Sequence, residues 1–137
     1  MFKDLFNLKG INWWTLLGGL GLNFMISVTI ALAGTFLAQH DTYGAAYEAY
    51  GQPAVMLIIF VLCGVAGFGI AKIADNVPTK HAFLSSMGAA VPMLAAFFLG
   101  PSIIVLMMAI VAVAGNLNGA MLAAPRRRNY GGPEGRR

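Results

Sequence analysis

Four long uncharged blocks dominate the pattern of apolar and polar positions along the chain. They cover residues 16–38, 53–71, 82–99 and 102–124, and almost every charged residue falls between or outside them. At ~1.5 Å of rise per residue, each block would make a helix of roughly 27 to 35 Å, which matches a hydrocarbon core of about 30 Å. The pattern therefore predicts an all-α membrane protein with four transmembrane helices.

The short connections between the blocks predict how the spans are joined. With their flanking residues, the predicted spans are 13–38, 53–74, 82–99 and 102–124. The remaining segments are an amphipathic N-terminus at 1–12, an external segment at 39–52, a cytoplasmic turn at 75–81, an external turn at 100–101 and a basic tail at 125–137. Because consecutive helices with short connections lie side by side, we expect two antiparallel hairpins.

The composition agrees with a chain that has lipid as its main solvent. It has 137 residues, of which 58% are hydrophobic and only 10% are charged, and its mean hydropathy is +0.74. The small residues Ala31 and Ala33 resemble a signal-peptide cleavage site, but the apolar stretch before them is longer than a usual signal-peptide core. We therefore expect the first block to remain as a helix.

The basic residues predict the orientation, because Lys and Arg favour the untranslocated side of a membrane. All nine lie on one side of the predicted topology: Lys3, Lys9, Lys72, Lys80, Arg126, Arg127, Arg128, Arg136 and Arg137. The segment 39–52 on the other side carries Asp41 and Glu48 but no Lys or Arg. This asymmetry predicts a multi-pass protein of the cell (inner) membrane with both termini in the cytoplasm.

Two short segments outside the spans carry helical periodicity. Apolar residues recur at spacings of three and four within 2–9, and Tyr43, Tyr47 and Tyr50 recur similarly within 42–51. Both patterns predict short helices that lie on a membrane surface. For 42–51 the alternative is a loop whose tyrosines join the aromatic belt, since glycines within it weaken a helix.

Two polar residues stand where helix N-caps are expected. Asn12 precedes the first span, and Thr79 follows Pro78 just before the third. Because Asn and Thr side chains accept hydrogen bonds from the free N–H groups of a first turn, both are predicted N-caps.

Rows of small and weakly polar residues predict helix-packing faces. The candidates on the first and fourth spans are Gly19, Asn23, Ser27, Ala112, Gly115, Asn116 and Gly119, and the second span carries Gly64, Gly67 and Gly69. Small residues allow close backbone approach in lipid, and amides add interhelical hydrogen bonds. We expect the fourth-span face to meet the first span or a helix of a partner subunit. A pore lining is the alternative for the same rows.

Groups that could carry chemistry are sparse. The four uncharged blocks contain no ionisable residue apart from the lone Cys63. His40 and His81 belong to opposite membrane faces, so they cannot share one metal ion or one haem. A single cysteine excludes an intramolecular disulfide and a cysteine-based metal site. The sequence therefore predicts no enzyme and no metal site. It requires no cofactor, and contact with a lipid or a pigment stays open.

The basic tail and the packing faces together suggest a function. Arg126, Arg127 and Arg128 follow the fourth span directly and suit anionic headgroups at the inner face or an acidic patch on a partner. Nucleic acid is not an expected partner, because no folded domain supports such binding. We expect a non-catalytic accessory subunit of a larger integral membrane complex, of a respiratory or photosynthetic electron-transport type, that packs against other membrane subunits and lipids. The alternative is a self-oligomerising small transporter or a holin-like pore.

Overall fold

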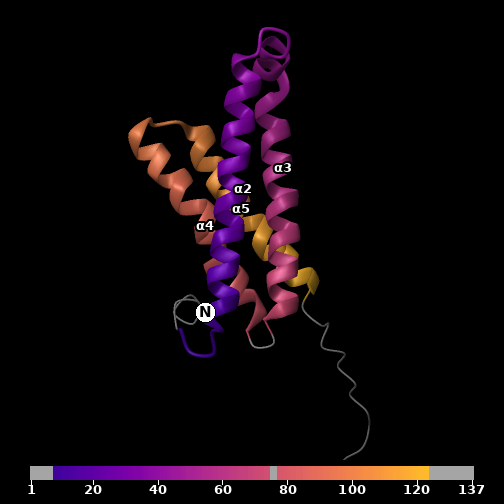
Figure 1. The fold of residues 1–137 in the computed structure, drawn as a ribbon, viewed down its shortest axis with the longest axis vertical. Coiled ribbons are helices and arrows are strands. Elements are labelled where there is room, and N and C mark those ends of the chain that lie inside the picture. The colour runs from indigo at the N-terminus through magenta and orange to yellow at the C-terminus, as the bar shows by residue number, and fades with distance from the viewer. Residues whose placement is uncertain (1–7, 75–76, 124–137) are drawn as a thin grey trace, which may run out of the picture.

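The computed structural model describes residues 8–74 and 77–123, and this part of the chain is helical (Figure 1). Its elements are α2 (Trp13–Gln39), α3 (Gly44–Ile73), α4 (Pro78–Leu99) and α5 (Ile103–Ala123). All four helices are long and apolar enough to cross a membrane, which confirms the predicted all-helical fold with four such helices and indicates a multi-pass membrane protein. Most of the segment 2–9, and the tail at 125–137, lie outside the described residues.

The segment 42–51 differs from both interpretations of its sequence. Its residues from Gly44 onward are the first turns of α3, which continues through Pro53 without interruption. A β-carbon on Gly34 of α2 would lie 2.7 Å from the Tyr47 hydroxyl oxygen, so the missing side chain makes room for this tyrosine. The segment therefore extends along α2 as part of α3 instead of forming a separate surface helix.

The two predicted N-caps have different outcomes. The Asn12 side chain accepts hydrogen bonds from the backbone N–H groups of Trp14 and Thr15, at 3.1 and 3.4 Å, which confirms it as the cap of α2. The prediction for Thr79 is wrong, because α4 already begins at Pro78 and its cap residue is Val77. Proline is well tolerated in a first turn, where its missing N–H would have no helical partner anyway.

The four helices form a bundle in which the backbones of every pair except α2 and α5 approach closely. The beginning of α2 and the end of α5 share one end of the bundle with Lys9, Lys72 and Lys80, and we call this the basic end (Figure 1). Toward the other end, α4 and α5 lean away from α2 and α3 (Figure 1). The buried core accordingly lies in the middle of the bundle and toward the basic end, and most α4 residues beyond Ala90 are not buried.

Candidate helix-packing site

The closest contact in the bundle joins α3 and α5 through glycines. A β-carbon on Gly119 would collide with the carbonyl oxygen of Gly64 and would lie 2.8 Å from the backbone nitrogen of Phe68. One on Gly115 would lie 2.6 Å from the carbonyl oxygen of Phe60. Because backbone atoms cannot rotate away as side chains do, only glycine permits this approach. The two helices therefore touch backbone to backbone.

This contact corrects the expected partner of the fourth-span face. We expected Gly115 and Gly119 to meet the first span or another subunit, whereas they lie against α3, and α2 is across the bundle. Gly67 of α3 completes the contact, since a β-carbon there would strike the backbone of Asn116. The glycines of the second span carried the relevant signal, but their spacing alone does not say which helix they approach.

A second close contact joins α2 and α4. A β-carbon on Gly19 would overlap the Ser85 hydroxyl, and one on Gly88 would collide with the backbone of Leu20. Sequence reasoning singled out Gly19 but missed Gly88 and Ser85. Ser85 and Gly88 could not be recognised as packing residues before α2 and α4 were known to be neighbours.

An amide pair spans the centre of the bundle between the two helices whose backbones do not touch. The Asn116 amide nitrogen donates to the Asn23 side-chain oxygen at 2.7 Å, and the Asn23 amide nitrogen donates back to Asn116 at 3.3 Å. Each amide also donates to a carbonyl one turn earlier in its own helix, that of Gly19 and that of Ala112. Both asparagines are fully buried. All four side-chain N and O atoms are thereby hydrogen-bonded.

Buried hydroxyl groups near this pair are mostly bonded within their own helices. Ser27 donates to the carbonyl of Phe24 at 2.8 Å, and Ser86 donates to that of Phe83 at 2.6 Å. The Ser85 hydroxyl is the exception: among the described residues it is the buried side-chain polar atom without a hydrogen-bond partner. This hydroxyl lies against Gly19 of α2.

A polar contact at the basic end ties the start of α2 to the start of α4. The backbone N–H of Asn12 donates to Nε2 of His81 at 2.8 Å, while Nδ1 of His81 lies 3.2 Å from the carbonyl oxygen of Val77. These partners fit the neutral tautomer with the proton on Nδ1. Lys80 adds a hydrogen bond from its ammonium group to the carbonyl oxygen of Lys9, at 3.3 Å. His81 is 1% exposed and serves as a structural acceptor.

The remaining candidate groups lie apart from one another. His40 stacks against Phe36 and Tyr43 at the end opposite His81. Cys63 is buried beside Gly115 in the contact between α3 and α5. Within residues 8–74 and 77–123, no three His, Cys, Asp or Glu side chains come together in a way that could hold a metal ion. Arg126, Arg127 and Arg128 lie outside the described part of the chain.

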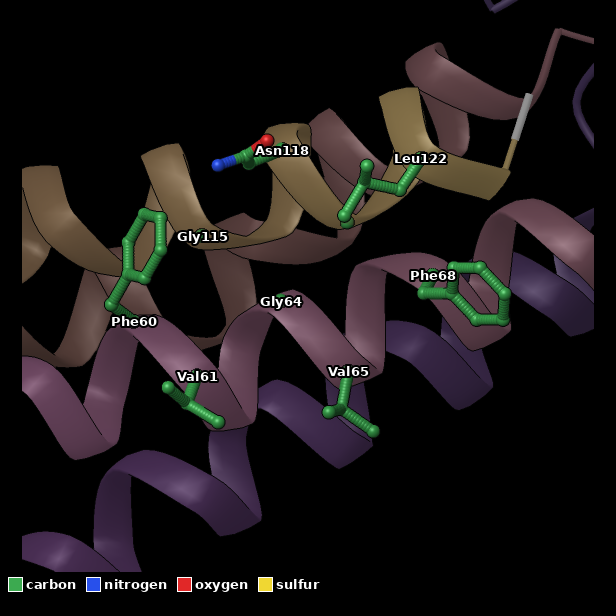
Figure 2. A pocket seen from close by; sticks show the side chains of 9 residues that line it. Phe60, Val61, Gly64, Val65, Phe68, Gly115, Asn118 and Leu122 are labelled. Carbon is green, nitrogen blue, oxygen red and sulfur yellow. The ribbon is translucent and has the colours of Figure 1, made fainter. Parts of the chain in front are cut away.

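Shallow apolar grooves follow the outer edges of the helix contacts. Figure 2 shows the one between α3 and α5, about 290 Å³ in volume, with Phe60, Gly64 and Phe68 along one side and Gly115 and Leu122 along the other. A larger groove of about 640 Å³ runs between α2 and α3. Comparison of the chain with family models, with curated proteins and with solved structures gives no match.

Proposed function

We propose that this protein is a non-catalytic accessory subunit of a larger integral membrane complex, of respiratory or photosynthetic type, which it supports through helix packing. The observation that carries the proposal is the reciprocal amide pair of Asn23 and Asn116. These strongly polar groups at the centre of the bundle bind each other and their own helices, so both N–H donors of each amide are already used within the chain. Their arrangement fits a structural role.

The row of small residues on α2 supports the same proposal. Its middle members, Gly19, Asn23 and Ser27, are buried against the other helices, while Ala31 and Thr35 near its far end are exposed. Thr35 donates to the carbonyl of Ala31 at 2.9 Å, as hydroxyl groups do on lipid-facing helices. The row therefore fits a packing face in its middle and a membrane-facing surface beyond it, in preference to the lining of a passage.

The outer surface suits contact with lipids and with helices of other subunits. Large apolar side chains are exposed along the helices, including Leu32, Leu57 and Val65. The groove between α2 and α3 begins at Trp14 and reaches Ile26, so it is long enough to receive lipid acyl chains or the side chains of a neighbouring helix. Such grooves beside an apolar surface are what membrane subunits use to fit together.

The orientation we propose places the basic end in the cytoplasm. Lys9, Lys72 and Lys80 share that end with the last turn of α5, and Asp41 and Glu48 belong to the opposite end. The positive-inside rule then puts both termini on the cytoplasmic side of the cell membrane. In this orientation Arg126 to Arg128 would meet anionic headgroups, each contributing about 1 kcal/mol near the surface.

Native purification tests the function. The full chain, carrying an affinity tag after Arg137, is isolated from its own membranes in a mild detergent, and the recovered proteins are identified by mass spectrometry. The proposal expects stoichiometric unlike membrane subunits, and these should be lost when Gly119→Leu separates α3 from α5. An unrelated membrane protein with the same tag is the control. Recovery of this chain alone, at any detergent concentration, would contradict the proposal.

The second candidate, a self-assembled pore or small transporter, is favoured by one observation. Asn118 of α5 is exposed, so an amide faces the outside of the bundle at a depth where lipid tails are expected. A purified preparation that increases solute leakage from sealed vesicles would favour this candidate over the accessory subunit.

A further inference from the structure

Asn118 is the polar side chain that the bundle itself leaves unexplained. It lies five residues before Ala123, the last residue of α5, so it is about 7.5 Å from the helix end along the axis. Figure 2 shows it on α5, at the edge of the groove between α3 and α5 that it helps to line. Among the described residues no hydrogen bond to this amide is found, in contrast to the buried Asn116 two positions earlier. A short side chain such as Asn cannot extend to the headgroup layer as Lys or Arg does.

The outward face of α5 has the spacing of a coiled-coil seam. Its members alternate at intervals of three and four residues, and we call them the α5 seam: Ile104, Met107, Val111, Ala114, Asn118 and Met121. None of them is buried. An apolar repeat of about 3.5 residues allows two helices to supercoil around each other with a small crossing angle. In that repeat Asn118 takes an a position, where a single Asn fixes register and the number of helices.

We propose that a second copy of this chain docks on the α5 seam, with the two Asn118 amides hydrogen-bonded to each other. The chemistry of the amide selects a copy over an unlike helix. Two copies with the same membrane topology are related by a two-fold axis along the membrane normal, which brings each residue opposite itself at the same depth. An amide carries both donors and acceptors, so it is complementary to itself. The pair of Asn23 and Asn116 already shows this reciprocal bond within one chain.

Most of the α5 seam lies away from the buried face of α5, although Val111 is partly buried against the core and Asn118 stands at the edge of the groove between α3 and α5. The buried face of α5 carries Ala112, Asn116 and Ala120, and the glycines that contact α3 flank it. Replacing Asn118 therefore removes no hydrogen bond observed within the chain. Dimerisation and folding can be tested separately. The dimer is also independent of the proposed function, because an accessory subunit can enter its complex as one copy or as two.

Energy transfer between labelled chains measures the pairing. Full-length chains carrying donor or acceptor fluorescent proteins at the C-terminus are reconstituted in vesicles of phosphatidylcholine and phosphatidylglycerol, and transfer is followed as the protein is diluted in lipid. Interhelical amide bonds in membranes predict that Asn118→Leu weakens dimerisation by about 3- to 30-fold, and that Asn118→Gln, which keeps the amide, restores most of it. Gly69→Leu, in the groove between α2 and α3, is the control for a change away from α5. Equal dimerisation of Asn118→Leu and the unmodified chain would overturn the proposal, as would transfer that fits only assemblies larger than two.

Cysteine cross-linking locates the interface. In a Cys63→Ala background, Met121→Cys places a thiol in the α5 seam, and Val65→Cys places one on α3 at a similar depth. The two native side chains are almost equally exposed, at 64% and 66%. Oxidation in native membranes should join two chains through Met121→Cys at least several-fold faster than through Val65→Cys. Equal rates, or faster linking through Val65→Cys, would overturn the assignment of the interface to α5.

Discussion

Adding one methyl group at Gly119 should separate α3 from α5. In Gly119→Ala the new β-carbon would overlap the Gly64 carbonyl oxygen and would lie 2.8 Å from the Phe68 nitrogen. Both obstacles are backbone atoms, so the helices must move apart. Overpacking of this kind costs about 1 to 3 kcal/mol. The higher helix propensity of Ala offsets up to about 1 kcal/mol of that cost and must be removed from the comparison.

Gly69→Ala provides the matched reference. Gly69 lies on the same pair of helices, and a β-carbon there would have no atom within 4 Å apart from its own helix backbone and chain neighbours. Both variants gain the same helix propensity, so the difference between them isolates the overlap. We expect Gly119→Ala to be less stable than Gly69→Ala by about 1 to 3 kcal/mol, which is roughly a 5- to 150-fold change in the opening equilibrium.

The assay uses the single cysteine as a reporter of this contact. Cys63 is fully buried, and its β-carbon would lie 3.2 Å from one added at Gly115, so its thiol becomes accessible when α3 and α5 separate. The rate at which a thiol-reactive coumarin dye labels Cys63 in detergent measures how often α3 and α5 separate. The same labelling followed against temperature gives the melting temperature of the protein. Cys63→Ala gives the background signal. Labelling of Gly119→Ala that is no faster than that of Gly69→Ala would refute the backbone contact.

Three further predictions test other parts of the structure. His81→Ala removes the acceptor of the Asn12 N–H, so amide exchange at Asn12 should accelerate and stability should fall by about 0.5 to 1.5 kcal/mol; unchanged exchange would contradict the contact. Ser85→Ala removes a buried hydroxyl without a partner among the described residues and should raise stability by about 1 kcal/mol, whereas a clear loss would show that this hydroxyl is bonded. A reporter inserted after Asp41 should register the outside of the cell while one after Arg137 registers the cytoplasm, and any other combination contradicts the proposed orientation.

The spans could be predicted because the signals that define them are local. The number of helices follows from comparing the length of each uncharged run with the thickness of a bilayer. The start of α2 follows from Asn12, which precedes a tryptophan pair and caps the helix. The helix α3 begins at Gly44, nine residues before the predicted span 53–74, because the segment taken as a separate surface helix or a loop is continuous with that span. In the structure the turns before it are stabilised by Tyr47, which fits over Gly34 on another helix. That contact depends on the tertiary arrangement.

The sequence predicted which residues form the helix-packing site, but it did not predict which helices those residues bring together. Gly115 and Gly119 were recognised as a packing face from their spacing, yet glycine rows on three helices are compatible with several pairs of neighbours. Asn23 and Asn116 were likewise singled out on separate helices. Their bond forms because α2 and α5 lie across the bundle at a distance that two amide side chains can span. The sequence carries no direct signal of that distance.

The central claim is that the polar side chains inside the spans hold the helices together and do not line a path. A double-mutant cycle with Asn23→Leu, Asn116→Leu and the combined variant tests it most directly, with stability measured by the labelling of Cys63 in detergent. Interhelical hydrogen bonds in membrane proteins are worth roughly 0.6 to 2 kcal/mol, so we expect a coupling free energy in that range. A coupling free energy indistinguishable from zero means that the double variant loses as much stability as the sum of the two single variants. That result would contradict the account.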